Sequence, residues 1–191
     1  MTSPVDLGAD AWQAIFHSAA LLLVISGLAK VANPRPAQFA ISHALGLRLS
    51  RARQTSYMVA TLEIIAGVSS LVSPLSAGPA LMLGLYLGFL VFILYLLLRG
   101  GKSSSCGCFG TADSPPSWLH VGINVLGIAA SAWAIQTEVP SFLSKVSNEG
   151  WLGFIGLFGT VGLVYLVISA MVLLPAAFSA FQADPSEGSA G

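Results

Sequence analysis

The sequence predicts an all-α fold, a polytopic transmembrane helical bundle. Of its 191 residues, 55% are hydrophobic and only 8% are charged, whereas about a quarter of the residues of a soluble domain carry charge. The mean hydropathy is +0.81, and five apolar runs are long enough to cross a bilayer as helices, which takes about 17–25 residues each. None of these runs alternates apolar and polar residues, so the strands of a membrane barrel are excluded.

The five predicted spans belong to a single transmembrane domain, residues 1–178. They cover residues 11–31, 57–75, 79–98, 118–135 and 151–174. Ser73-Pro74 and Gly78-Pro79 indicate a tight turn between the second and third spans, and Ser114-Pro115-Pro116 indicates an N-cap followed by prolines at the start of the fourth. Residues 1–10 contain no Lys or Arg, so the first span does not resemble a cleavable signal peptide. Residues 179–191 are predicted to be a disordered tail.

Glycine spacings predict close helix packing in two of the spans. Gly84 and Gly88 form a GxxxG pattern in the third span, and glycines recur at every third position from Gly153 to Gly162 in the fifth. A helix face without side chains allows a neighbouring backbone to approach closely. We interpret both patterns as structural.

The net charge is zero, but the basic residues are unevenly distributed. Eight Lys and Arg balance eight Asp and Glu, so bulk electrostatics indicates no nucleic-acid partner. Five alternating crossings place seven of the eight basic residues on one side: Lys30, Arg35, Arg48, Arg51, Arg53, Arg99 and Lys102. The positive-inside rule puts this side in the cytoplasm. Residues 99–117, which contain both cysteines, connect two spans on the same side.

Polar side chains in the spans are candidates for a functional site, because a charged residue at the bilayer centre costs about 2.5–3.5 kcal/mol on insertion scales. Glu63 and Asn124 lie about 10 Å from the cysteine-bearing side of their spans, at a rise of about 1.5 Å per residue, and Lys30 ends the first span on that side. Together with His120, these residues predict a polar cluster at the membrane face that carries the cysteines.

Each of these residues also has a structural interpretation. Lys30 can act as an anchor whose stem reaches the membrane surface, and Asn124 can hydrogen-bond a neighbouring helix. Glu63 is harder to explain in this way, because a carboxylate at that depth has to be paired or protonated.

The motif Cys106-Gly107-Cys108 is the strongest chemical signal in the chain. Two thiols separated by one glycine can close a small, strained disulfide ring, and such a disulfide readily oxidises other dithiols. Arg99 and Lys102 upstream, and the helix start downstream, favour the thiolate form. The motif therefore favours thiol–disulfide exchange.

Two other interpretations of the cysteines stay open. The pair could bind a soft metal such as Cu(I) or Zn with His120 or His43 as a further ligand, although a structural zinc site needs four ligands. The pair could also be a structural clip or two free thiols.

These motifs together resemble the MauE family, part of the wider DoxX-like superfamily of redox-associated membrane proteins. The resemblance extends over residues 11–135 and rests on Cys106-Gly107-Cys108-Phe109-Gly110, Gly27-Leu28-Ala29-Lys30-Val31, Leu62-Glu63-Ile64-Ile65-Ala66-Gly67 and Asn124. It implies a four-helix core to which the Gly-rich fifth span is added. It also implies action with a thioredoxin-like partner in forming the disulfides of a client enzyme, as MauE proteins are thought to do for the small subunit of methylamine dehydrogenase.

By this resemblance, Cys106 and Cys108 are the redox pair, and Lys30, Glu63 and Asn124 are the intramembrane polar positions of the family. His120 departs from the pattern, since we would expect an arginine there. A single cysteine pair, without a C-x-x-C, has to be recharged by another molecule. No cofactor or bound metal is firmly predicted beyond the redox-active Cys106–Cys108 disulfide, and a quinone stays open without a motif that supports it.

We expect a multi-pass protein of the plasma membrane, but the two arguments about its orientation disagree. The basic residues place the cysteines in the cytoplasm, whereas disulfide formation in an exported client places them outside. An interfacial helix containing Arg48, Arg51 and Arg53 would reduce the weight of the charge argument. Two alternatives to a redox function are a module that binds or transports a soft metal and a non-catalytic scaffold subunit of an oxidoreductase complex.

Overall fold

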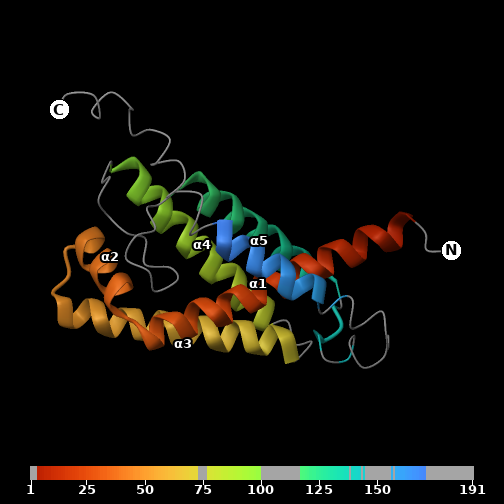
Figure 1. Ribbon diagram of the computed structural model, residues 1–191, viewed down its shortest axis with the longest axis horizontal. Helices are drawn as coiled ribbons and strands as arrows, with labels where there is room; N and C mark the ends of the chain where they lie inside the picture. Colours follow the sequence, from red (N-terminus) through yellow and green to blue (C-terminus); the bar gives the residue numbers. More distant parts are fainter. Residues whose placement is uncertain are drawn as a thin grey trace, which may run out of the picture.

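The structure is a computed structural model that describes residues 4–72, 77–99, 117–137, 139–142, 144, 156 and 158–170. Five helices follow in the order α1 (Pro4–Ala32), α2 (Arg35–Leu45), α3 (Leu49–Val72), α4 (Ala77–Leu98) and α5 (Trp118–Gln136) (Figure 1). A short apolar helix, Phe158–Ala170, lies further along the chain. All regular secondary structure in these ranges is helical, as predicted.

Four helical segments are long and apolar enough to cross a membrane: Gly8–Ala32 of α1, and the whole of α3, α4 and α5. They correspond to the first four predicted spans and confirm a multi-pass helical bundle. The described part of the fifth predicted span, Phe158–Ala170, is apolar but shorter than a span. The predicted tail, residues 179–191, lies outside the described residues.

The helices extend beyond the predicted spans, and two predictions about turn and cap residues are wrong. α1 and α3 begin at Pro4 and Leu49, before their apolar runs, because residues outside the hydrocarbon region can extend a helix without being apolar. Gly78 and Pro79 lie in the first turn of α4, where proline gives up no helical hydrogen bond, and not in the preceding turn. The N-cap of α5 is Ser117 and not Ser114.

Helix α2 is an element that the apolar-run criterion does not predict, since it lies within the long connection after the first span. It buries small residues such as Ala37 and Ala40 on one face, and it ends at Gly46, which has a φ of 63° and supplies the left-handed C-cap. The Tyr95 hydroxyl of α4 donates a hydrogen bond of 3.0 Å to the carbonyl oxygen of Ala44. This bond ties α2 to the C-terminal part of α4.

The arginines of the same connection do not form the expected interfacial helix of their own. Arg48 precedes α3, whereas Arg51 and Arg53 belong to the first turns of α3 itself. The guanidinium carbon of Arg53 lies 5.7 Å from the centroid of the Tyr57 ring, and the Arg53 side chain is exposed.

The C-terminal ends of α1 and α4 and the N-terminal ends of α3 and α5 lie at one end of the bundle, at the left of Figure 1 beside α2. We call this the basic end, because six basic residues belong to these helix ends and to α2: Lys30, Arg35, Arg48, Arg51, Arg53 and Arg99. The other two basic residues, Lys102 and Lys145, lie outside the described residues.

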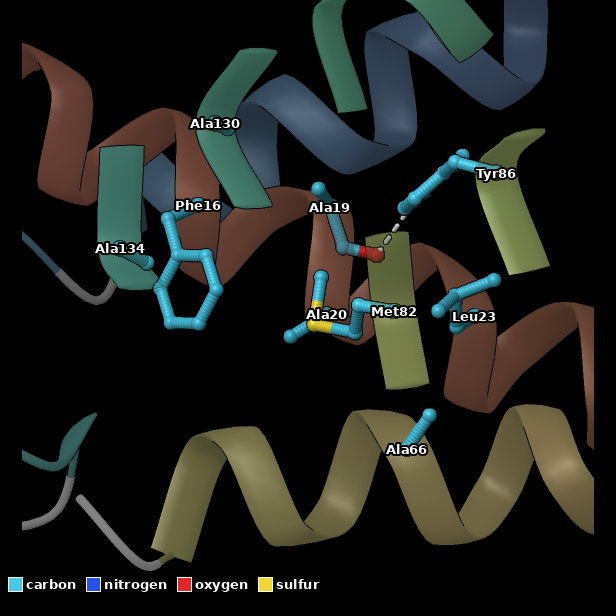
Figure 2. Close-up of a cluster of buried hydrophobic side chains, with 9 residues drawn as sticks. All are labelled: Phe16, Ala19, Ala20, Leu23, Ala66, Met82, Tyr86, Ala130 and Ala134. Carbon is cyan, nitrogen blue, oxygen red and sulfur yellow. Dashed lines mark hydrogen bonds between the residues drawn. The ribbon is translucent and has the colours of Figure 1, made fainter. Parts of the chain in front are cut away.

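The core lies between α1, α3, α4 and α5, with α1 packed mainly against α3 and α4 mainly against α5. Its central cluster is drawn in Figure 2 and consists of Phe16, Ala19, Ala20, Leu23, Ala66, Met82, Tyr86, Ala130 and Ala134. The Tyr86 hydroxyl donates a hydrogen bond of 2.7 Å to the carbonyl oxygen of Ala19, which links α4 to α1. Alanine is the commonest residue in the cluster, and small side chains allow membrane helices to pack closely.

Close approach between helices depends on glycines other than those predicted. A Cβ at Gly27 would lie 2.7 Å from the Ile64 side chain, and one at Gly67 would lie 2.5 Å from the carbonyl oxygen of Ala20, so both glycines hold α1 against α3. By contrast, a Cβ at Gly84 or Gly88 would meet nothing within 4 Å. The GxxxG pattern in α4 therefore makes no contact with another described helix.

Candidate functional site

The centre of the candidate site is an ion pair between Lys30 of α1 and Glu63 of α3. The Lys30 ammonium nitrogen donates hydrogen bonds to both Glu63 carboxylate oxygens, at 2.7 and 2.9 Å. Glu63 is 0% exposed and Lys30 is 5% exposed. Lys30 therefore points into the bundle, and the interpretation of this residue as a membrane-surface anchor is wrong.

Ser26 bonds both members of this pair, and the sequence did not predict its role. Its hydroxyl donates to a Glu63 oxygen at 3.0 Å and accepts a hydrogen bond of 2.6 Å from Lys30. Ser26 precedes Lys30 by one helical turn, so both side chains lie on one face of α1. A polar residue four positions before a membrane lysine is a signal that could have identified it.

The ion pair lines a cavity of about 50 Å³ that we call the polar cavity after its charged and polar side chains, although most of its wall is apolar. It reaches the last turn of α1 with Lys30 and the first turn of α5 with His120, both at the basic end. His120 and Asn124 of α5 line the same cavity, together with Tyr86 and Phe89 of α4. The volume is large enough for a few water molecules, and the wall offers them charged and neutral polar partners. The structure thus brings four of the six sequence-predicted site residues, Lys30, Glu63, His120 and Asn124, around one space.

His120 and Asn124 are held in place by bonds within their own helix region. The Ser117 hydroxyl lies 2.8 Å from Nδ1 of His120, and the Asn124 amide donates a hydrogen bond of 2.6 Å to the carbonyl oxygen of His120. His120 is 1% exposed and Asn124 is 6% exposed. The Asn124 amide hydrogen bond is thus made within α5, whereas an interhelical bond was the structural interpretation of this residue.

Aromatic packing adds to the environment of Lys30. Its ammonium nitrogen lies 5.5 Å from the centroid of the Phe89 ring, within the range of a cation–π contact. The positive charge is therefore stabilised by a carboxylate, a hydroxyl and a ring face, which is what a buried lysine in a membrane bundle requires.

Cys106 and Cys108 lie outside the described residues, so the structure does not place the predicted redox pair. The described chain stops at Arg99 after α4 and resumes at Ser117 before α5. Both residues belong to the basic end, where the polar cavity also lies. Among the described residues, no group of three His, Cys, Asp or Glu side chains could hold a metal ion.

The comparison with family models decides the family. The model described as "Methylamine utilisation protein MauE" matches residues 11–137, which is more than half of the chain. The chain belongs to the MauE family. Comparison with curated proteins and with solved structures gives no match.

The structure shows what two of the MauE-like motifs do within this fold. Gly27 and Lys30 of the first motif, and Glu63 and Gly67 of the second, lie on the facing sides of α1 and α3. The glycines bring the two backbones together, and this close approach allows a lysine and a glutamate from different helices to meet with full burial. The spacing of glycine and charged residue within each motif therefore allows Lys30 and Glu63 to form the buried ion pair.

Proposed function

We propose that this MauE protein is a membrane component of thiol–disulfide exchange in which Cys106 and Cys108 cycle between dithiol and disulfide with a thioredoxin-like partner. Its role is to support disulfide formation in a client enzyme, or the maturation of that enzyme, as in the maturation of methylamine dehydrogenase. The observation that supports this proposal most directly is the buried Lys30–Glu63 pair, which shares one cavity with His120 and Asn124 at the basic end.

The placement of the helices links this cavity to the cysteine segment. α4 ends at Leu98 and α5 begins at Trp118, so the segment that contains the cysteines both leaves and re-enters the bundle at the basic end. His120 is in the first turn of α5, and Ile93 in the last part of α4 also lines the cavity. Both ends of the cysteine segment therefore lie on the side of the bundle that the cavity reaches.

The chemistry of the cavity suits a site where thiols react. Thiol–disulfide exchange proceeds through a thiolate, so a proton has to leave the attacking thiol and a proton has to reach the departing one. A buried carboxylate, a lysine and a histidine around a space for water can store and pass protons, as such residues do in membrane proton relays. We assign Lys30, Glu63 and His120 this positioning and proton-handling role, and Asn124 a role in orienting the His120 segment.

Single substitutions of the cysteines test the proposal. In the exchange reaction, one cysteine attacks the partner disulfide and the other resolves the mixed disulfide, so Cys106→Ser or Cys108→Ser should trap a mixed disulfide with a thioredoxin-like protein. The trapped species should disappear on reduction and should be absent from the Cys106→Ser/Cys108→Ser double variant. Recovery of no mixed disulfide from either single variant, with normal amounts of folded protein, would count against the proposal.

A second measurement tests the role of the ion pair separately from folding. The Lys30→Met/Glu63→Leu double variant removes both charges together, which keeps the core apolar and avoids an unpaired charge. We expect this variant to fold and to exchange disulfides with its partner more slowly than the wild type. Gly122→Ala, in an exposed position of α5 with nothing within 4 Å, is the control and should exchange at the wild-type rate.

A further inference from the structure

A second cavity, which the proposed thiol chemistry does not use, lies between α2, α3 and α4. It has a volume of about 280 Å³ and an almost wholly apolar wall, and we call it the lateral cavity. Residues on its wall include Ile41, Val59, Gly84, Gly88, Phe89 and Phe92. Its volume is close to the lower end of the range for small-molecule sites, about 300–1,000 Å³.

Among the described residues, the lateral cavity opens on the outer surface of the bundle. Gly84 and Gly88 are exposed, and a side chain built at either position would meet no atom within 4 Å. Both lie within the membrane-spanning length of α4. A ligand of this cavity can therefore enter from the hydrocarbon part of the bilayer, which favours a lipid-soluble molecule.

Lys30 also lines this cavity, so the lateral cavity and the polar cavity share a wall. Because the Lys30 ammonium contacts both oxygens of Glu63, one of these two hydrogen bonds can be exchanged for a ligand oxygen while the ion pair persists. Phe89 is the other residue that lines both cavities. The ligand should therefore have a hydrogen-bond acceptor at one end of an apolar body.

The wall also indicates the shape of the ligand. Phe89 and Phe92 supply aromatic rings, and Gly84 and Gly88 supply backbone without side chains. Flat rings pack well against aromatic faces, and a surface without side chains allows them close approach. A planar ring that carries a carbonyl group meets all of these conditions better than an acyl chain does.

We propose that the lateral cavity binds the ring of a membrane quinone, with one carbonyl oxygen directed at Lys30. The electron-transfer part of this inference rests on the proposed function, in which a single cysteine pair has to be recharged. Oxidation of the Cys106–Cys108 dithiol forms one S–S bond and releases two electrons and two protons, and the quinone takes up both pairs to become a quinol. The quinone is thus the acceptor of both electrons, and Lys30 and Phe89 form the wall that its cavity shares with the polar cavity.

Binding is tested on the full-length protein in nanodiscs, with a benzoquinone that carries a decyl tail as the probe. We expect saturable binding to the wild type, and at least about tenfold weaker binding to Gly88→Leu, whose new side chain occupies the cavity. Gly122→Leu is the matched control, because it is also an exposed helical glycine with nothing within 4 Å but does not line the cavity. Decanol, which has the tail but no ring, should not displace the probe.

A redox measurement then separates this inference from the proposed function. Reduced protein is mixed with the quinone without oxygen, and the thiols are counted by alkylation; we expect thiol loss and quinol formation in the wild type, and slower loss in Gly88→Leu. Absence of saturable binding, equal binding by Gly88→Leu, or displacement by decanol overturns the quinone site, even where mixed disulfides with a partner still form. Quinone binding that Gly88→Leu abolishes, in a protein whose cysteines never form a mixed disulfide, supports the site and overturns the exchange function.

Discussion

Lys30 and Glu63 belong to different helices and form an ion pair of 2.7 Å in which the carboxylate is fully buried. Burial removes both charges from water, and this loss is offset only because the pair is complete and Ser26 adds further hydrogen bonds. The pair also requires that α1 and α3 lie close together, which Gly27 and Gly67 allow. The polar site and the packing of the first two spans are therefore one structural unit.

Removal of one partner should destabilise the protein more than removal of both. Glu63→Gln or Lys30→Met leaves a buried charge without its counterpart and should lower the free energy of unfolding by about 3–5 kcal/mol. Lys30→Met/Glu63→Leu should recover most of that loss. Unfolding of the four proteins in the same detergent, followed by circular dichroism, gives this comparison.

Arg48→Met controls for the loss of a positive charge, because Arg48 is exposed. It should change the free energy of unfolding by less than about 0.5 kcal/mol. Equal destabilisation by the single and double variants would show that the two side chains do not depend on each other.

Gly67→Ala should destabilise the contact between α1 and α3. The added methyl carbon would lie 2.5 Å from the carbonyl oxygen of Ala20, a backbone atom that can move only with its helix. We expect a loss of about 1–3 kcal/mol in the free energy of unfolding, the usual cost of overpacking. Gly122→Ala has open space around it and should leave stability unchanged or slightly higher. A thermal melt of both variants that shows the same midpoint would contradict the assignment of Gly67 as a packing glycine.

Tyr95→Phe should loosen α2 with little effect on the bundle. The change removes the hydrogen bond from the Tyr95 hydroxyl to Ala44, which ties α2 to α4, and such a bond contributes about 0.5–1.5 kcal/mol. Amide hydrogen exchange should become faster in residues 35–45 and stay the same in α3 and α5. Tyr86→Phe, which removes the bond to Ala19 in the core, is the control and should not change exchange in α2 alone. Unchanged exchange in α2 of Tyr95→Phe would mean that other contacts hold this helix.

Accessibility of single cysteines distinguishes the two orientations, because the charge distribution places the basic end in the cytoplasm whereas disulfide formation in an exported client requires it outside. In a Cys106→Ser/Cys108→Ser background, Gly8→Cys near the start of α1 and Leu45→Cys at the end of α2 place one exposed thiol at each end of the bundle. If the charge distribution sets the orientation, a membrane-impermeant thiol reagent labels Gly8→Cys in intact cells and Leu45→Cys only after lysis. The opposite pattern would place the cysteine segment outside, on the side of an exported client.

The sequence alone predicts the helical membrane class, the first four spans and the residue types of the site, because hydropathy and the cost of charge in a bilayer depend on composition along a single segment. It also indicated that Lys30, Glu63, His120 and Asn124 could meet at one membrane face. It missed α2, whose amphipathic pattern is shorter than a span, and it missed Ser26 as the third member of the pair.

The packed bundle is needed to establish whether Lys30 points to the membrane surface or into the bundle, and which glycines form helix contacts. Both questions depend on how one helix is rotated against its neighbour, and a rotation of this kind is set by packing across helices and leaves no mark in the local sequence. For that reason Gly27 and Gly67 close the α1–α3 contact around a buried ion pair, while Gly84 and Gly88, which have the stronger sequence pattern, face a cavity that opens toward the lipid.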